Sequence, residues 1–352
     1  MQKPRLTWEE ITLEFHRPFR LSKGISATRR AFWIRLSGDE GWGEGTIPPY
    51  YGIEDEEMTT LWSKAAQNEI PFPDNPAKIA AWIGDEGPAP AKCALDLALH
   101  DRIAKKQNIP LYRLLGLSKP VPIATAFTIG IASPEEMAKI AAENAQYPVI
   151  KLKLGSDDDI ARVAAVRSAR PDARIYVDAN AGWMPEEAVR LAKALAPYHL
   201  DMIEQPVAKD DIEGMGYVQA NTEIPIVADE SVCTLADVEA LAKAGIKGIN
   251  LKLMKIGGLI PALEMLQRGK ELGLKIMLGC MSETALGVTA MAHLTAYADW
   301  IDLDAPLLIK NNPFKGLRYD EQALIHIPDQ AGIGVALIEK CSEGDSKQKK
   351  RY

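Results

Sequence analysis

The stretch VIKLKLG, residues 149–155, carries two lysines on one face of a single short strand. Side chains alternate between the two faces of a strand, so Lys151 and Lys153 point one way and their apolar neighbours point the other way. On an antiparallel sheet such a charged face would be solvated. The fold around this stretch therefore decides whether the two lysines face water or a site inside the protein.

The chain around this stretch repeats one pattern from about residue 121 onward. Short apolar strands alternate with amphipathic helices of about 10 to 15 residues, which is typical of βα units on a parallel sheet. The predicted strands are residues 122–130, 149–155, 174–182, 201–207, 224–231, 248–258, 275–281 and 300–309. The helices predicted between them are residues 133–145, 157–169, 184–196, 234–245, 261–273 and 284–298, with a broken segment near 210–221.

Eight such strands favour a closed barrel of the TIM type. A doubly wound open sheet is the alternative, and it is disfavoured because no glycine fingerprint follows the first strand. The segments on either side of the repeat are mixed in pattern. We therefore predict an α/β fold with an α+β domain at residues 1–120, a catalytic barrel at 121–315 and a C-terminal segment at 316–352 that packs on the first domain.

Local patterns divide the N-terminal domain further. Two runs rich in β-branched and aromatic residues predict strands, and polar or proline-rich runs predict loops. The predicted strands are residues 6–15 and 29–45, the predicted loops are residues 20–29 and 46–57, and a helical pattern begins at about Ala89.

The composition narrows the function and the compartment. The 352 residues are 47% apolar, which supports a sizeable core, and the net charge of −7 argues against a nucleic-acid partner. The only basic cluster is the tail at 347–352. The start lacks the apolar core of a signal peptide, and no run reaches the ~18 apolar residues of a membrane span. We expect a cytoplasmic protein with a small-molecule partner and no membrane.

Cysteine and histidine show no ligand spacing. The four cysteines are scattered, with no paired spacing and no partner histidine, which argues against a disulfide framework and against a zinc site. They are Cys93, Cys233, Cys280 and Cys341. A reduced compartment fits this pattern.

Charged residues recur along the chain at an interval of about one βα unit. Lys153 to Asp178 is 25 residues, Asp178 to Glu204 is 26, Glu204 to Asp229 is 25, and Asp229 to Lys252 is 23. Each lies at or near the end of a predicted strand, and in a barrel these ends meet at one mouth. Each acid could instead cap a helix or join a salt bridge. Three acids in register on successive strands favour a shared site.

Three neighbouring carboxylates would repel one another and raise one another's pKa unless a cation lay between them. A set of oxygen ligands without histidine or cysteine suits a hard ion, Mg²⁺ first and Mn²⁺ second. The sequence therefore predicts a metal site formed by Asp178, Glu204 and Asp229.

The lysines of the opening stretch fit inside such a barrel. Neither face of a parallel barrel strand meets open water, so Lys151 and Lys153 must face the interior near the mouth. Neighbouring, partly desolvated ammonium groups are expected to have a lowered pKa and to act as bases near neutral pH. Lys252, on the sixth strand, would lie across the barrel from Lys153. The pair predicts removal of a proton from one face of a carbon and its return on the other.

That carbon would lie α to a carboxylate, because the metal then makes an enediolate accessible. Lys151 would add positive charge at the carboxylate. The last strand adds Asp302 and Asp304, two residues apart and thus on one face. They are either a solvated pair at the end of a strand or a site for a cation of the substrate. Cys280 and Met281, after the seventh strand, are expected to line the pocket.

Taken together, the motifs KLKLG, DAN, IEQP, ADES and NLKLMKIGG resemble the enolase superfamily, in particular its muconate-lactonizing-enzyme subgroup. The resemblance covers nearly the whole chain. It implies an α+β capping domain, a modified (β/α)7β barrel and a C-terminal return to the cap. It also implies Mg²⁺ ligands at Asp178, Glu204 and Asp229, and acid/base roles for Lys153 and Lys252, with Lys151 assisting.

Within the subgroup, the Asp302/Asp304 pair looks like the DxD motif of dipeptide epimerases of the L-Ala-D/L-Glu epimerase type. There the pair binds the α-ammonium of the first residue, the metal takes the C-terminal carboxylate, and the α-carbon of the second residue is inverted. Thr128 matches a substrate-contacting position of that family, although a strand threonine needs no such role. The resemblance thus implies a magnesium-dependent dipeptide epimerase, an isomerase, with a dipeptide as substrate.

Family members that act on L-Ala-D/L-Glu use a cationic residue in the loop after the first strand. Here the alignment places Ser26 at that position, with Lys23, Arg29 and Arg30 displaced from it. An acidic second residue therefore remains open, and so does a hydrophobic or otherwise different one.

Other functions remain open at this stage. Muconate cycloisomerase, o-succinylbenzoate synthase and N-acylamino acid racemase belong to the same subgroup, but their substrates lack a free α-ammonium. A catalytically silent barrel would have lost a member of the charged ring, and here all are present. A homo-oligomer is expected from the family only.

Overall fold

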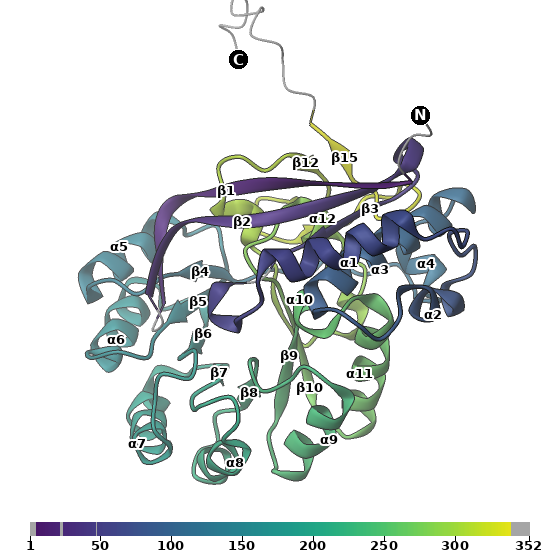
Figure 1. Ribbon diagram of the computed structural model, residues 1–352. Coiled ribbons are helices and arrows are strands. Elements are labelled where there is room, and N and C mark those ends of the chain that lie inside the picture. Colours follow the sequence, from purple (N-terminus) through teal and green to yellow (C-terminus); the bar gives the residue numbers. More distant parts are fainter. Residues whose placement is uncertain (1–4, 22–23, 47, 339–352) are drawn as a thin grey trace, which may run out of the picture.

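The computed structural model describes residues 5–21, 24–46 and 48–338 of the chain. The N-terminal domain begins with a long antiparallel hairpin of β1 (Leu6–Leu21) and β2 (Gly24–Leu36), which lies across the top of the molecule in Figure 1. A third strand, β3 (Trp42–Gly45), pairs with β2.

The predicted loop over residues 20–29 is mostly wrong. The pairing of β1 with β2 runs to the end of the hairpin, where Leu21 lies opposite Gly24. Polar residues in this stretch gave no strand pattern, but backbone hydrogen bonds between two paired strands do not require apolar side chains.

Four helices complete this domain, and they are α1 (Asp55–Gln67), α2 (Ile79–Ile83), α3 (Ala89–Lys106) and α4 (Leu111–Leu114). A capping box between Glu54 and Glu57 starts α1 inside the predicted loop over residues 46–57. Helix α3 packs so closely on β3 that a Cβ at Gly43 would lie 1.9 Å from the carbonyl oxygen of Ala94. Only glycine permits this approach.

The second part of the chain forms a closed parallel barrel. Its strands, in spatial and chain order, are β4 (Phe127–Ile129), β5 (Val149–Lys153), β6 (Arg174–Asp178), β7 (Met202–Glu204), β8 (Ile226–Ala228), β9 (Gly248–Leu251), β10 (Lys275–Gly279) and β11 (Trp300–Asp302). The first and last strands meet where the Ala126 N–H donates to the Ile301 carbonyl at 3.0 Å. This closure excludes the doubly wound open sheet.

Helices surround the barrel (Figure 1). They are α5 (Pro134–Glu143), α6 (Asp159–Ala169), α7 (Pro185–Leu195), α8 (Ile212–Ala220), α9 (Leu235–Lys243), α10 (Leu253–Ile256), α11 (Leu259–Glu271), α12 (Ala285–Ala292) and α13 (Ala305–Leu308). The predicted strands over 248–258 and 300–309 end early, because the short helices α10 and α13 follow β9 and β11 at once. Apolar residues alone do not distinguish a buried strand from a buried helical turn.

The barrel interior is layered, and the lysine face of β5 points into it. Val149, Lys151 and Lys153 share that face, and Val149 belongs to an apolar cluster that forms the floor. The other buried members of the floor are Ala126, Tyr176, Met202, Val227, Met277 and Trp300. The strand β9 contributes Gly248, where a Cβ would lie 2.9 Å from the Trp300 ring. The lysines therefore lie above a dry floor rather than on a solvated face.

The chain then returns to the N-terminal domain. Four short strands follow the barrel, and they are β12 (Phe314–Lys315), β13 (Arg318–Tyr319), β14 (Ile325–His326) and β15 (Ala336–Leu337). Phe314 packs edge-on against Trp33 and Trp42, with ring centroids 4.7 and 5.5 Å away. Cys341 and the basic tail at 347–352 lie outside the described residues.

The structure bears on the cysteines and on the search for membrane spans within the described residues. Cys93, Cys233 and Cys280 are free cysteines. Among the helices of the described ranges, none combines the length and the hydropathy needed to cross a bilayer.

A buried histidine joins the barrel to both flanking segments and gives a pH prediction. His293 Nδ1 accepts a hydrogen bond from the Tyr112 N–H, and Nε2 bonds to the Ile333 carbonyl. Burial lowers the pKa of His293 to about 4. Between pH 6.5 and 4 the unfolded chain binds this proton and the folded chain does not, so stability falls as the pH falls.

The expected loss across this window is roughly 3 kcal/mol of unfolding free energy. Denaturant unfolding of the native protein and of H293Q at several pH values measures it as a difference between the two pH dependences. The control H16Q changes an exposed histidine of β1 and should follow the native curve. Identical curves for the native protein and H293Q would contradict the prediction.

Candidate active site

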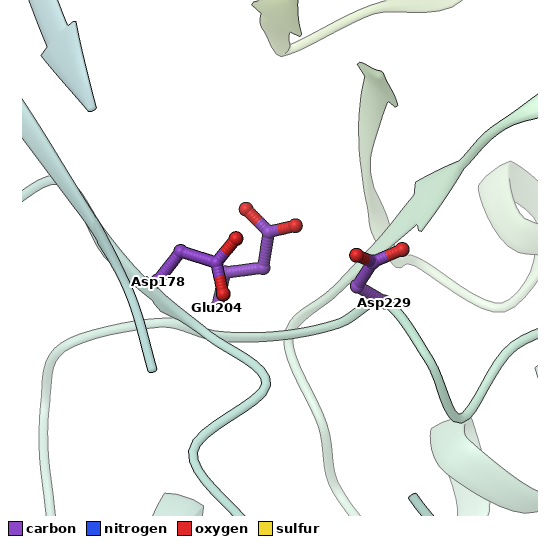
Figure 2. A group of neighbouring side chains, drawn as sticks. All are labelled: Asp178, Glu204 and Asp229. Atoms are coloured by element: carbon purple, nitrogen blue, oxygen red, sulfur yellow. The ribbon is translucent and has the colours of Figure 1, made fainter. Parts of the chain in front are cut away.

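Three buried carboxylates meet at the carboxyl ends of neighbouring barrel strands (Figure 2). Asp178 ends β6, Glu204 ends β7 directly beside it, and Asp229 follows β8. One oxygen from each lies within 4.8 Å of the others. The spacing of about one βα unit has thus placed them in one site, as the sequence predicted.

Lysines flank the carboxylate triad on both sides. Lys153 Nζ lies 2.6 Å from Asp178 Oδ2, and Lys252 Nζ lies 2.8 Å from Asp229 Oδ2. The two lysines therefore bind the two ends of the triad. Both come from strand ends, since Lys153 closes β5 and Lys252 follows β9.

The third lysine, Lys151, lies deeper and connects two groups of acids. Its Nζ is 2.6 Å from Glu204, 3.1 Å from Asp178 and 2.7 Å from Asp302. Its side chain is fully buried. A single ammonium group thus joins the triad to the acid pair Asp302/Asp304 at the end of the last strand.

These contacts correct the expected pKa values. Lys151 has a raised pKa, because its three carboxylates outweigh the burial that would lower it. Lys252 also has a raised pKa, since Asp229 and Glu204 outweigh burial. The predicted lowering of the pKa is therefore wrong for Lys151, because the prediction neglected the acids that face it.

Repulsion among the three acids is only one of the effects that set their pKa values. Burial raises the pKa of Glu204 to about 7, with repulsion from Asp178 next in size. Burial acts on Asp178 as well, but Lys153 and Lys151 outweigh it and hold the pKa of Asp178 at about 2. The pKa of Asp229 lies well below its usual range, because Lys252 and a further lysine, Lys255, oppose its burial.

Sequence reasoning missed three residues that hold the triad in place. Lys255, on α10, lies 2.5 Å from Asp229 Oδ1, and the Asn250 amide donates to Glu204 Oε1 at 2.8 Å. Gln205 Oε1 accepts a hydrogen bond from the Asp229 N–H at 2.9 Å. The signal for Asn250 was its position two residues before Lys252, on the same strand face. The sequence predicts a strand over residues 248–258, so it did not place Lys255 on a helix that faces Asp229.

The acid pair at the end of the last strand, Asp302 and Asp304, is held by hydrogen bonds from Thr128 of β4. The Thr128 N–H donates to Asp304 Oδ2 at 2.7 Å, and its hydroxyl donates to Asp302 Oδ1 at 3.2 Å. Both acids are buried, and burial followed by repulsion from Asp302 raises the pKa of Asp304 to about 7. Cys280 donates through Sγ to the Asp302 carbonyl at 3.4 Å, and burial raises the pKa of its thiol.

One cavity of about 80 Å³ brings these groups together with residues of the N-terminal domain. Its barrel lining is Thr128, Lys153, Asn180, Lys252, Cys280, Met281, Ser282, Asp302, Asp304, Ala305 and Leu308. Its lining from the N-terminal domain is Phe15, Arg29, Pro48 and Tyr50. A groove of about 1020 Å³ adjoins the cavity and shares Phe15, Thr128 and Leu308 with it.

The cationic candidates near the first hairpin are separated by the fold. Arg29 lines the cavity, whereas Arg30 points elsewhere and pairs with Glu10. Ser26 is not part of the lining, and its hydroxyl donates to the Thr28 carbonyl. Lys23 lies outside the described residues.

Family profiles match both parts of the chain. A profile described as "Mandelate racemase / muconate lactonizing enzyme, N-terminal domain" matches residues 7–116, and one described as "Enolase C-terminal domain-like" matches residues 135–341.

Known proteins are similar over nearly the full length. The chain is 35% identical to an L-Ala-D/L-amino acid epimerase of Maribacter sp., over 95% of this chain and 99% of that protein. It is 36% identical to an L-Ala-D/L-Glu epimerase of Bacteroides thetaiotaomicron, over 87% and 80%.

A crystal structure of the dipeptide epimerase from Enterococcus faecalis, complexed with Mg and L-Leu-L-Tyr, has a TM-score of 0.88 and 32% identity. The match covers 96% of this chain and 100% of that one. The two profiles, the full-length identity and the shared barrel with its cap show that this chain belongs to the mandelate racemase/muconate lactonizing enzyme family of the enolase superfamily.

Proposed function

We propose that this protein is a magnesium-dependent dipeptide epimerase that inverts the α-carbon of the C-terminal residue. One observation carries the proposal: Lys153 and Lys252 bind opposite ends of a buried carboxylate triad. Relatives named L-Ala-D/L-amino acid epimerase and L-Ala-D/L-Glu epimerase, which align over 95% and 87% of this chain, support it. The chemistry of the site indicates which residues would bind the metal, transfer protons and bind the substrate.

The triad fits a magnesium ion. Its donors are three carboxylates without histidine or cysteine, which is the ligand type that Mg²⁺ prefers. The raised pKa of Glu204, about 7, is the mark of a carboxylate for which the nearby lysines compensate only in part. Held by Asp178, Glu204 and Asp229, a magnesium ion would supply positive charge for the substrate carboxylate.

Lys153 and Lys252 would act on opposite faces of the α-carbon. The carboxylates that raise the pKa of Lys252 are those of the triad, and a magnesium ion held there would offset their charge. One lysine in its neutral form would then take the α-proton, and the electron pair of the C–H bond would move toward the carboxylate. The other lysine, as an ammonium, donates a proton to the opposite face, which forms the new C–H bond. Each lysine ends in the state in which its partner began. Exchange with water restores both.

Lys151 would remain charged throughout. Its ammonium group contacts Asp178, Glu204 and Asp302, and its raised pKa keeps the proton in place. It adds fixed positive charge beside the substrate carboxylate, in a site that the apolar floor keeps dry. Manganese is the alternative ion for the same ligands.

Asp302 and Asp304 would bind the α-ammonium of the first residue. Thr128 holds one oxygen of each carboxylate, so both acids face the same cavity in a fixed orientation. An ammonium group placed there gains charge-assisted hydrogen bonds. Thr128 and Cys280 complete this end of the pocket.

Incubation with Mg²⁺ and a dipeptide library in D₂O tests the proposal. We expect deuterium to enter the α-carbon of the second residue, and mass spectrometry measures this uptake. The same dipeptides with an acetylated amino terminus should lose about 10- to 100-fold in kcat/KM, because the acid pair then has no cation to bind. Turnover restricted to muconate, o-succinylbenzoate precursors or N-acylamino acids would contradict the proposal.

A further inference from the structure

Each carboxylate of the triad has one oxygen bound by a group that takes no part in the proposed chemistry (Figure 2 shows both oxygens of each). These three oxygens are Asp178 Oδ1, bound by the Asn180 N–H at 2.9 Å, Glu204 Oε1, bound by the Asn250 amide at 2.8 Å, and Asp229 Oδ1, bound by Lys255 Nζ at 2.5 Å. One oxygen of every carboxylate is thus already engaged.

The other oxygen of each carboxylate faces a lysine of the reaction site. These oxygens are Asp178 Oδ2 beside Lys153, Glu204 Oε2 beside Lys151, and Asp229 Oδ2 beside Lys252. A cation that takes the place of these ammonium contacts meets one available oxygen on each carboxylate. The site therefore offers a metal ion three single oxygens rather than three pairs.

Lys255 is held in place by all of its hydrogen-bond donors. Its side chain is fully buried, and its ammonium group bonds to the Asp229 carboxylate, the Asp229 carbonyl and the Asn250 carbonyl. An ammonium group has three donors, so none is left for a ligand. Within the part of the chain that the structure describes, the cavity lining includes Lys153 and Lys252 but not Lys255. Lys255 can thus orient Asp229 but does not reach a substrate.

Asn250 serves Glu204 in a similar way. Its side chain is fully buried and donates to Glu204, whereas its own Oδ1 has no hydrogen-bond partner among the described residues. A buried amide oxygen without a partner is unfavourable, and a leucine of similar shape would avoid that cost. The contribution of asparagine at this position is therefore its bond to Glu204.

The number of oxygens that a carboxylate offers distinguishes two common divalent cations. Mg²⁺ is small and demands near-octahedral geometry, whereas Ca²⁺ takes roughly six to eight oxygen ligands and accepts both oxygens of one carboxylate. Carboxylates that are free to turn can satisfy Ca²⁺ in this way. Carboxylates with one oxygen already bound cannot do so without breaking that bond.

We propose that Lys255 and Asn250 set the metal selectivity of the site, because they restrict Asp229 and Glu204 to one oxygen each and so favour Mg²⁺ over Ca²⁺. Both are positioning residues, since they act through the carboxylates and not on the substrate. The inference rests on the proposed function, which places a metal at this triad. It adds a reason for the choice between two ions that have the same charge and both prefer oxygen.

Calorimetric titration of the metal-free protein with Mg²⁺ and with Ca²⁺ tests the proposal. The native protein should bind Mg²⁺ more tightly, so that the dissociation constant for Ca²⁺ divided by that for Mg²⁺ exceeds one. In K255M, and separately in N250L, this ratio should fall by about 10-fold or more, the lower end of the effect of losing a group that orients a metal ligand. The native measurement needs no variant, and either variant decides the matter if the other does not fold.

Lys153 gives a matched control for charge. Removal of any cation beside the triad strengthens the attraction for both ions, because they carry the same charge. K153M removes an ammonium group from Asp178 Oδ2, an oxygen that the site offers to the metal. It should tighten the binding of both ions by a similar factor and leave the ratio unchanged. A change of the ratio in K153M as large as in K255M would show an effect of charge alone and overturn the proposal.

Deuterium exchange separates the failure of this inference from the failure of the proposed function. Tighter binding of Ca²⁺ than of Mg²⁺ by the native protein, or an unchanged ratio in K255M and N250L, would overturn the inference alone if the native protein still exchanges a dipeptide in D₂O. Absence of binding for both ions, together with absence of exchange for every dipeptide, would overturn both.

Discussion

K153M and K252M each lose about 10³- to 10⁴-fold in the kcat of epimerisation, which is the upper range for removal of one general acid or base. Methionine keeps the length and much of the apolar volume of lysine but carries no proton. Inversion needs a proton taken from one face and delivered to the other, so either substitution suffices. The rate of inversion is measured by polarimetry or chiral chromatography, with a dipeptide substrate that the library test identifies.

The two variants also differ in which enantiomer they exchange. With one lysine left, deuterium from D₂O enters only the enantiomer whose α-hydrogen faces that lysine. K153M and K252M should therefore exchange opposite enantiomers. A control comes from the opposite end of β9: Lys247 is exposed and directly precedes this strand, whereas Lys252 directly follows it. K247M should keep the native rate, and inversion by K153M within tenfold of that rate would disprove the two-lysine mechanism.

Removal of the metal abolishes epimerisation, with an expected loss of about 10³-fold or more, because the stabilisation at stake is several kcal/mol. EDTA treatment followed by dialysis should produce the inactive protein, and Mg²⁺ should restore it. Mn²⁺ should restore it as well, since it prefers the same ligands. Full activity in excess EDTA would contradict a metal-dependent reaction.

Glu204 separates metal binding from folding. E204Q removes the carboxylate whose pKa lies at about 7 and leaves Lys151 its contacts with Asp178 and Asp302. The variant should unfold at a denaturant concentration close to that of the native protein, yet bind Mg²⁺ at least 10-fold more weakly by calorimetry. Equal Mg²⁺ affinity would remove Glu204 from the ligand set.

The barrel and its charged ring could be predicted because both depend on local periodicity. A repeat of about 25 residues and strand-end positions fix Asp178, Glu204 and Asp229 on neighbouring strands, whatever the details of the connecting helices. The face of Lys151 and Lys153 follows from the same argument, since side chains alternate along β5.

Contacts between segments distant in the chain could not be predicted in this way. The carboxylate of Glu44, on β3, accepts hydrogen bonds from the Thr284 and Gly287 N–H groups at the start of α12, 240 and 243 residues later. Arg29 entered the cavity for the same reason, because only the packing of the hairpin on the barrel selects it over Arg30. No pattern in one sequence contains such information.

The predicted direction of the Lys151 pKa shift was wrong for a related reason. Repulsion between the two neighbouring lysines of β5 was visible in the sequence, but the attraction of Lys151 to Glu204 and Asp302 was not. The nearest opposite charges came from other strands. Their effect exceeded that of burial, so the direction of the shift reversed.

The shared contact of Lys151 has a consequence for the length of the substrate. Glu204 and Asp302 lie within one hydrogen-bond length of the same nitrogen atom, so the spacing between the carboxylate end and the ammonium end of the pocket is set by a single side chain. An added residue would move a terminal amine by up to about 3.5 Å. If the protein has the proposed function, the fixed spacing lets the pocket bind dipeptides but not tripeptides. Longer peptides would then not be epimerised.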